Sequence, residues 1–434
     1  MIEQKLTEKP DFLALAAEQP GFFPALLESQ SYQASIGQFD VLFAAPDVEL
    51  VAFDHEQFQH LLETINCQPN EQRSLLPFQS GWLVYFSYES AYLMEPKLAH
   101  LIQPSKEPLA IAIHCQGALV YDRKNQQTWV CGASEQAVTE ILSRCQYDPQ
   151  WLPGAVSIED WYEEPGQQFT AAVEQAKALI VSGDIYQANL SRQYTCRLQE
   201  GTAAVDVMAR LKQANPAPFA AFLQVNDFAV VSSSPERLLG ISEGWVETRP
   251  IAGTRPRGTD EQTDQALIEE LINTPKEQAE HIMLIDLERN DVGKVCQIGT
   301  VEVDELMVIE SYQHVHHIVS NVKGKLLPDV SVVDVIRALF PGGTITGCPK
   351  IRCMQVIHDI ESRPRGCYTG SMGYINHNGQ VDLNILIRTV EINGRQLTFN
   401  AGAGIVYDSQ AAAELTETRH KAQGMIRALE MDAI

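Results

Sequence analysis

Short apolar runs separated by turn signals fill much of the chain. Each run is apolar throughout or alternates apolar with polar residues, and Gly, Pro, Asp or Ser residues bound it, which is typical of half-buried antiparallel strands. The clearest runs in the first part of the chain are Phe39–Pro46, Gly81–Glu89, Leu109–Cys115 and Ala118–Asp122. Later runs of the same kind are Ala220–Val225, Phe228–Ser232, 308–322 and 371–406.

Apolar residues at helical spacing predict four helices. They are Gln168–Ser182, with Gly183 as a C-terminal stop, then Thr274–Asp291, Pro349–Ile360 and Ser409–Arg427. In the second of these, Pro275 takes the first helical position, where its missing N–H costs nothing, and Thr274 is the expected N-cap. Because strands and helices are mixed rather than strictly alternating, the pattern favours an α+β fold with mainly antiparallel sheets over a doubly wound fold.

Two segments are predicted to lack regular structure. Cys145–Gly166 carries three prolines and several acidic residues, so it is the best candidate for a linker between domains. It divides the chain into an N-terminal subdomain, residues 1–150, and a second domain, residues 165–432. Pro250–Gly258 is expected to be a loop.

Composition and charge narrow the class of protein. The chain has 434 residues, of which 45% are apolar and 20% charged, the profile of a soluble globular protein. Its formal net charge of -24 argues against nucleic acid or an anionic membrane as a partner. It contains no apolar run long enough to span a bilayer, its charged first residues do not resemble a signal peptide, and its nine cysteines include no C-x-x-C pair. A cytoplasmic location is therefore expected.

Two pairs of glutamates on two predicted helices suggest a metal site. Glu277 and Glu280 share one helix face, and Glu414 and Glu417 repeat the spacing near the C-terminus. Carboxylates approaching from two helices would suit a hard cation, most plausibly Mg²⁺. A second interpretation is purely structural, since Glu277 also fits a capping box with Thr274 and exposed glutamate pairs are common on helices.

Glycine-rich segments and two isolated charges suggest an anion site. Gly342–Lys350 lacks the Lys–Ser/Thr order of a P-loop, and Ala401–Val406 lacks the third glycine of a dinucleotide fingerprint. Either segment could bring backbone N–H groups close to an anion, or could simply form a tight turn. Arg388, in an apolar run, needs an anionic partner, either a ligand or a salt bridge. Glu236 follows a strand and a proline, where it could act as a general acid or be solvated.

Taken together, long strings in the chain resemble the chorismate-utilising enzymes, the family of anthranilate synthase component I and aminodeoxychorismate synthase component I. The matching strings are GDIYQANLSRQ, SSPERLL, PIAGTRPRG, KEQAEHIMLIDLERND, HHIVSNVKG, FPGGTITGCPK, RGCYTGSMGYI, AGAGIVYDS and ETRHKA. They extend over most of residues 165–425. The resemblance implies two packed, mainly antiparallel β-sheets, a sandwich, surrounded by helices.

The resemblance also implies roles for residues that bind Mg²⁺ and substrate. Glu280 and Glu417 would coordinate Mg²⁺, with Glu277 and Glu414 binding it through water or from behind the ligands. The ion would hold the ring carboxylate of chorismate. The groups implied for the enolpyruvyl carboxylate are Tyr368, Arg388, Lys421 and the backbone N–H groups around Gly402 and Gly404.

Further roles concern catalysis. Glu236 resembles the acid that protonates the departing C4 hydroxyl, and His317 resembles the active-site histidine, with Thr344 lining the same cavity. Gln187 stands where related isochorismate and salicylate synthases carry a water-activating lysine. Because glutamine cannot act as that base, the expected nucleophile is ammonia from a separate glutamine amidotransferase subunit.

The product is expected to be 4-amino-4-deoxychorismate, a step toward para-aminobenzoate and folate. YQANLS, NPAPFAAFL, GGTITG and FDVLFAAP look more like aminodeoxychorismate synthase than anthranilate synthase. Ala252 stands where one subgroup of the former carries a nucleophilic lysine, so a covalent adduct through this position is excluded. The alternatives are anthranilate formation and a non-catalytic amino-acid-binding subunit.

The segment PALLES resembles the tryptophan site of the family. Leu27, Glu28 and Ser29 would line a pocket in the N-terminal subdomain, and tryptophan is a candidate ligand. The alternative is a purely structural role, in which the segment is the end of a core helix.

Overall fold

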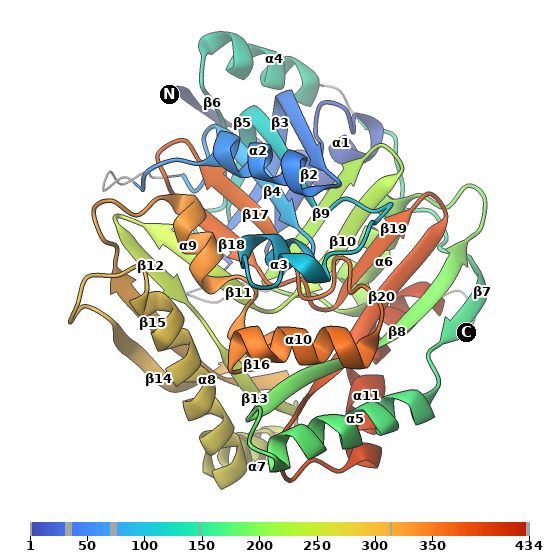
Figure 1. The fold of residues 1–434 in the computed structure, drawn as a ribbon. Helices are drawn as coiled ribbons and strands as arrows, with labels where there is room; N and C mark the ends of the chain where they lie inside the picture. Colours follow the sequence, from blue (N-terminus) through green and yellow to red (C-terminus); the bar gives the residue numbers. More distant parts are fainter. Residues whose placement is uncertain (1, 31–36, 70–75, 147–148, 313–314, 431–434) are drawn as a thin grey trace.

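The chain folds into sheets wrapped by helices (Figure 1). The computed structural model describes residues 2–30, 37–69, 76–146, 149–312 and 315–430. Within these ranges it contains 20 strands and 11 α-helices, arranged in mixed order along the chain. The strands pair in antiparallel fashion and join edge to edge into one continuous hydrogen-bonded network. The predicted α+β class is confirmed.

The network curls so that two stretches of sheet face each other. One apolar core is built almost entirely from strand residues, among them Phe43, Tyr85, Leu223 and Val230. The strands on one side of this core are β3 (Phe39–Ala52), β4 (Gly81–Phe86), β5 (Ala110–Asp122) and β17 (Ser371–Asn376). Those on the other side are β2 (Ala25–Glu28), β9 (Phe219–Val225) and β10 (Phe228–Ser234). Sheet packs on sheet here, as in the expected sandwich.

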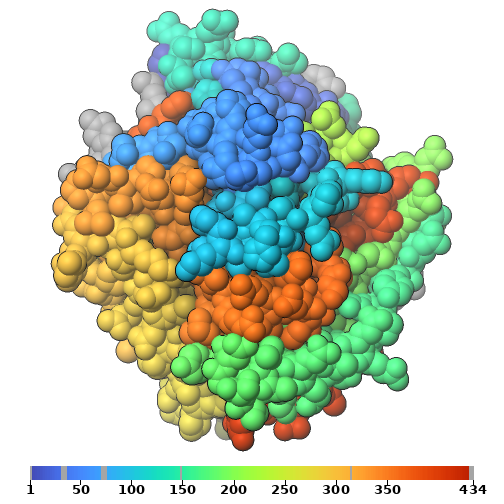
Figure 2. Space-filling view, viewed as in Figure 1, coloured from blue at the N-terminus to red at the C-terminus, as the bar shows by residue number. Residues whose placement is uncertain are grey.

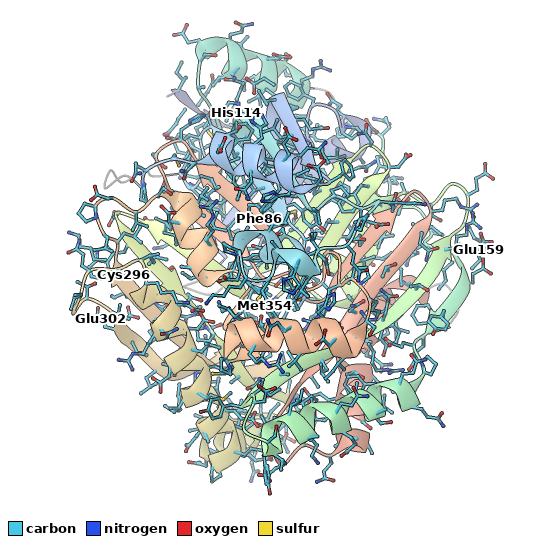
Figure 3. The ribbon with its side chains drawn as sticks, in the orientation of Figure 1. Phe86, His114, Glu159, Cys296, Glu302 and Met354 are labelled. Atoms are coloured by element: carbon cyan, nitrogen blue, oxygen red, sulfur yellow. The ribbon has the colours of Figure 1, made fainter. Side chains whose placement is uncertain are left out.

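Helices pack against the outer faces of the sheets, and the apolar side chains between them form two further cores. One core contains residues from α2 (His55–Ile65), α5 (Gly166–Val181), α8 (Pro275–Gly293), α9 (Val332–Leu339) and α10 (Lys350–Glu361). The other contains residues from α1 (Phe12–Glu18), α4 (Glu135–Cys145), α6 (Ala204–Ala214) and α11 (Ala411–Glu430). Phe86 and Met354, both in the core that includes α10, lie near the centre of the view in Figure 3, and Glu159 and Glu302 lie near its opposite edges.

Figure 2 shows how the helices on one face pack in bands. The orange band that contains α10 lies between the cyan segment near residue 100 and the green band of α5. Both helices contact β8 (Gln187–Leu198), the strand beneath them. This strand is therefore buried, and its position is set from outside by two helices.

The four predicted helices are present, with one local error at a helix start. The helix expected at Thr274–Asp291 begins at Pro275 as predicted, but Thr274 does not cap it with its side chain. Its hydroxyl instead donates to the carbonyl of Glu270 at 2.6 Å, the last turn of the preceding helix α7 (Glu261–Asn273). The capping box with Glu277 is therefore wrong, because the two helices follow each other without a linker.

Two segments predicted as irregular contain strands. The expected loop at Pro250–Gly258 contains β13 (Ile251–Pro256), which pairs with β15 (Val315–Lys325). Its glycine and prolines resembled a loop because Gly253 lies at a bulge with a φ of 68°. The expected linker contains β7 (Ile158–Glu163), which pairs with β8 and is mostly exposed, so it lacks the apolar alternation of a half-buried strand.

The division into residues 1–150 and 165–432 stays a prediction. The sheet itself crosses the proposed boundary twice, because β2 pairs with β9 and β4 pairs with β17.

Candidate active site

The floor of the site is formed by two neighbouring strands, β8 and β20 (Gln396–Ile405). A side chain on Gly402 would bring its Cβ within 2.8 Å of Asn189 Oδ1, and one on Gly404 within 2.8 Å of Gln187 Nε2. The glycines are therefore needed because two carboxamides from β8 lie over them. Since Gly402 and Gly404 belong to a regular strand, the interpretation of Ala401–Val406 as a tight turn is wrong.

A tyrosine and a lysine meet at the same floor. The Tyr368 hydroxyl lies directly above Gly402. Burial raises the pKa of Tyr368 to about 12, so the hydroxyl stays protonated and can donate a hydrogen bond. Lys421 Nζ, from α11, donates to the carbonyl of Gly402 at 3.1 Å and pairs with Glu417 at 2.7 Å. Hydrogen-bond donors thus gather above the glycines.

Two buried carboxyl groups are held by one tight turn. The turn is the short 3-10 helix at Gly343–Ile345, inside the glycine-rich segment. Thr344 Oγ1 donates to Glu236 Oε1 at 2.8 Å, and the Gly343 backbone N–H donates to Glu288 Oε1 at 3.1 Å. Burial, strengthened by the negative charge of Glu288, raises the pKa of Glu236 to about 8. Glu236 is only 5% exposed, so it is not the solvated residue of the alternative interpretation.

Arg388 and His317 face the same space as Glu236. Arg388 lies in the connection between β18 (Val381–Asn384) and β19 (Thr389–Asn393), at a φ of 52°, rather than within a strand. Burial lowers its pKa, and the charge of Glu236 opposes that change. Among the described residues Arg388 forms no ion pair, so the salt-bridge interpretation finds no partner there.

His317 is a neutral imidazole with one free nitrogen. Burial, together with the charges of Arg388 and Lys421, lowers its pKa to about 3. Its Nδ1 lies 2.9 Å from Thr254 Oγ1 on β13, and its Nε2 is buried with no hydrogen-bond partner among the described residues. A buried nitrogen of this kind is expected to find its partner in a ligand.

Ala252 lies beside this histidine. In the β13–β15 pair, Ala252 is opposite Ile318 and Thr254 is opposite His317, with the bulge at Gly253 between them. Ala252 is buried but belongs to none of the apolar cores of the described residues. The side chain at this position is a methyl group, which cannot act as a nucleophile.

The four predicted metal ligands lie on α8 and α11. Burial raises the pKa values of Glu280 and Glu414, and the charge of Glu414 adds to the rise at Glu280, so the two helices bring their carboxylates near each other. Lys276 lies 3.6 Å from Glu280, and Arg255 lies 3.2 Å from Glu277. Across the described ranges, no three acidic, histidine or cysteine side chains converge tightly enough to hold a metal ion. The oxygen donors suit Mg²⁺, but in this structure cationic side chains engage them.

Sequence reasoning overlooked two residues of this site. Asn189 and Glu288 both lie within strings that carried the resemblance, YQANLS and DLERND, but neither was assigned a role. A polar residue in an apolar strand and an acidic residue on the apolar side of a helix are signals of buried polar function. Only the strand and helix orientations show that both face the site.

The predicted tryptophan-type pocket corresponds to a separate cavity of about 380 Å³. It is lined by Leu27, Glu28, Ser29, Arg237, Trp245 and Asp382, among others. Leu27 and Glu28 belong to strand β2, so the alternative of a helix end is wrong. Glu28 already pairs with Lys212 at 2.6 Å. Tryptophan as its ligand stays a prediction.

The curled antiparallel sheet with a buried acid, cations and carboxylate pairs defines an enzyme that acts on a small anionic substrate. Residues 24–427 match the model of the family described as chorismate binding enzyme, and the chain belongs to that family. The fold agrees with the solved structure of anthranilate synthase component I from Streptococcus pneumoniae, with a TM-score of 0.78, 30% identity, and coverage of 91% of this chain and 94% of that one.

Curated relatives carry two different names. The chain is 42% identical to an anthranilate synthase component I-like protein of Synechocystis, covering 82% of this chain and 74% of the relative. It is 39% identical to aminodeoxychorismate synthase component 1 of Bacillus subtilis, covering 86% of this chain and 82% of the relative. The chain is thus a chorismate-utilising enzyme, and these names do not decide between two products. Among the described residues, no helix is long and apolar enough to cross a membrane.

Proposed function

We propose that this enzyme aminates chorismate at C4 to give 4-amino-4-deoxychorismate, with ammonia from a glutamine amidotransferase subunit. The feature that supports amination is Gln187, whose carboxamide lies over Gly404. By the resemblance, this residue stands where relatives that activate water carry a lysine. A carboxamide cannot deprotonate water, whereas ammonia brings its own lone pair. The names of the relatives, component I and component 1, support a second subunit.

The cationic side of the site binds the anionic substrate. Arg388 and Lys421 carry positive charge close enough to His317 to add to the lowering of its pKa by burial. The Tyr368 hydroxyl lies above the floor that Gly402 keeps open. In a water-poor site these groups stabilise a carboxylate far more than they would in bulk water. They would hold the enolpyruvyl carboxylate and orient C4 toward the buried acid.

Glu236 supplies the proton for the leaving group. Its raised pKa keeps the carboxyl protonated at neutral pH, and Thr344 fixes one of its oxygens. As the bond between C4 and oxygen breaks, Glu236 transfers its proton and the hydroxyl leaves as water. The nitrogen lone pair forms the new bond to carbon, and the proton lost by nitrogen restores the acid. Positioned acid catalysis of this kind contributes about 10²–10⁴-fold in rate.

Mg²⁺ is the proposed cofactor. When bound, it would neutralise the ring carboxylate and hold the substrate in register. The residues proposed to hold it are Glu280 and Glu417, with Glu277 and Glu414 supporting them. Their chemistry fits, because hard cations prefer carboxylate oxygens. Burial, with the charges of neighbouring glutamates adding to it, raises the pKa values of Glu280 and Glu414.

The choice of C4 over C2 rests on the sequence strings and on the Bacillus subtilis relative. Ala252 favours the alternative, anthranilate formation, because it removes the covalent route through a lysine. If ammonia reaches C4 here, it does so without a covalent adduct at residue 252.

Product analysis tests the proposal. The purified chain is incubated with chorismate, Mg²⁺ and an ammonium salt, and an aminodeoxychorismate lyase is then added. We expect para-aminobenzoate only after the lyase is present. Fluorescent anthranilate formed without lyase would establish the alternative product, and no amination at all, with or without the partner subunit, would support a non-catalytic role.

A further inference from the structure

We propose that Asn189 is a catalytic residue that binds the nitrogen nucleophile, with its side-chain oxygen accepting an N–H hydrogen bond from ammonia. The inference rests on the proposed amination, but it holds whether nitrogen adds at C4 or at C2. It assigns a function to a polar residue of the YQANLS string that the resemblance left without one.

The side chain of Asn189 is buried, and its oxygen has no hydrogen-bond partner among the described residues. The residue is only 8% exposed. Buried acceptors are seldom left without a donor in a native protein, and those that are commonly await a ligand or water.

The backbone of Asn189 is held firmly from both sides. Its N–H donates to the carbonyl of Thr346 at 2.9 Å, and its carbonyl accepts from Arg365 Nη2 at 2.7 Å. The residue also lies opposite Gly404 in the β8–β20 ladder. The carboxamide is therefore presented from a fixed strand and is not a mobile surface group.

The neighbours of the carboxamide show which ligand it suits. Its oxygen reaches over Gly402, where the Tyr368 hydroxyl also lies, and Lys421 binds the carbonyl of the same glycine. Gln187, two residues earlier on the same strand face, reaches over Gly404. An anionic carboxylate would be bound by the hydroxyl and the ammonium group but repelled by a carbonyl oxygen. Asn189 Oδ1 can instead accept a hydrogen bond from a neutral ligand that carries an N–H group.

The position also explains how nitrogen could be oriented. With one N–H of ammonia directed at Asn189 Oδ1, the nitrogen is held beside Gly402 and its lone pair is free to form the bond to the substrate carbon. Holding a nucleophile in this way replaces a random encounter by a near-attack arrangement. Water could make the same hydrogen bond, so Asn189 is proposed to orient the nucleophile while the lack of a base selects ammonia.

The test separates the Michaelis constants of the two substrates. We expect Asn189→Ala to raise KM for ammonium chloride at least 10-fold, with KM for chorismate changed less than twofold. Asn189→Ser keeps an oxygen acceptor and should recover part of the loss. Gln193→Leu, which removes a carboxamide further along the same strand face, is the matched control and should leave both constants unchanged.

Two results would overturn the inference. One is a rise in KM for chorismate with that for ammonium unchanged, which would make Asn189 a substrate-carboxylate ligand. The other is no change in either constant for a variant that melts at the wild-type temperature. If Asn189→Ala does not fold, Asn189→Ser is compared with wild type by the same criteria. Wild-type protein that shows no ammonium-dependent product would instead refute the proposed amination itself.

Discussion

At the scale of single residues, the main feature of the site is that Glu236 stays protonated although positively charged side chains lie near it. Arg388 and Lys421 favour the ionised form of Glu236, but burial and the nearby Glu288 outweigh them. Consecutive residues of one turn, Gly343 and Thr344, each hold one of the two carboxyl groups. The pH range in which the acid works is therefore set by its burial and by the charges and hydrogen bonds around it.

This arrangement predicts opposite effects of two substitutions on the pH profile. Glu236 works when protonated, so kcat/KM should fall as pH rises through about 8. The Thr344 hydrogen bond favours the carboxylate, so Thr344→Val should raise the pKa of Glu236 and move this limb to higher pH. The charge of Glu288 disfavours the carboxylate, so Glu288→Gln should move the limb to lower pH.

The measurement is kcat/KM for chorismate against pH, at a constant concentration of free ammonia so that its own titration does not contribute. Glu302→Gln, at an exposed strand position far from the site, serves as the control (Figure 3). Limbs that move in the same direction in both site variants would contradict the assignment of Glu236 as the titrating acid.

At the scale of elements, strand β20 shows how the pairing of two strands positions the side chains of the site. Its glycines give room to side chains of β8, and α11 crosses it with Lys421. The two glycines are not equivalent. A Cβ on Gly402 would lie 2.7 Å from the rigid carbonyl of Leu190, whereas one on Gly404 would meet only the flexible end of Gln187.

Alanine substitutions should therefore separate stability from activity. Gly402→Ala is expected to cost about 1–3 kcal/mol of unfolding free energy, because the backbone of β8 must shift. Gly404→Ala should leave the melting temperature near wild type and lower kcat/KM about 10-fold to 100-fold by displacing the Gln187 carboxamide. Gly293→Ala, with open space around it, is the control. Thermal melts and ammonia-dependent rates check all three, and equal behaviour of Gly402→Ala and Gly404→Ala would contradict this account.

The pair of helices α8 and α11 supports a prediction about the metal. Glu280→Ala should abolish Mg²⁺-dependent turnover and leave the fold intact, because a partly exposed carboxylate adds little to stability. Glu417→Gln should raise the Mg²⁺ concentration needed for half-maximal rate by at least about 10-fold. The readouts are a magnesium titration of the rate and a thermal melt. Glu269→Ala on the neighbouring helix α7 is the control, and a wild-type magnesium response in Glu280→Ala would refute the assignment.

At the scale of the whole molecule, the sheet ties both ends of the chain into one structure. β2 and β4, from the first part of the chain, pair with β9 and β17 of the later part. All four strands contribute to the core between the two facing stretches of sheet, the core that contains Phe43 and Tyr85. The N-terminal part is therefore a structural component of the sheet that supports the site, whatever the cavity beside Leu27, Glu28 and Ser29 binds.

Residues 165–432 expressed alone should not fold cooperatively. Removing the first part of the chain exposes the edges of β9 and β17 and uncovers the core between the two facing stretches of sheet. Exposed strand edges of this kind promote aggregation. We expect little soluble protein and no sharp thermal transition, with recovery when residues 1–150 are co-expressed. A soluble fragment that melts cooperatively and aminates chorismate would show that the predicted second domain is independent.

The α+β class, the helices at Pro275 and Lys350 and the lack of a basic group at Gln187 can all be predicted from the sequence, because local periodicity and residue chemistry are properties of short segments. Sequence reasoning misassigned Pro250–Gly258 as a loop and proposed a capping box between Thr274 and Glu277 that is absent, because pairing with β15 and the preceding helix outweigh local signals. The tertiary structure was needed to show that Glu236, His317, Arg388 and Lys421 lie close enough to influence one another's pKa values. It was also needed to show that Asn189 and Tyr368 both reach over Gly402. The charge of Lys421 acts on Glu236 across more than 180 residues of chain. The sheet registers that bring such groups together depend on long-range pairing that no short segment contains.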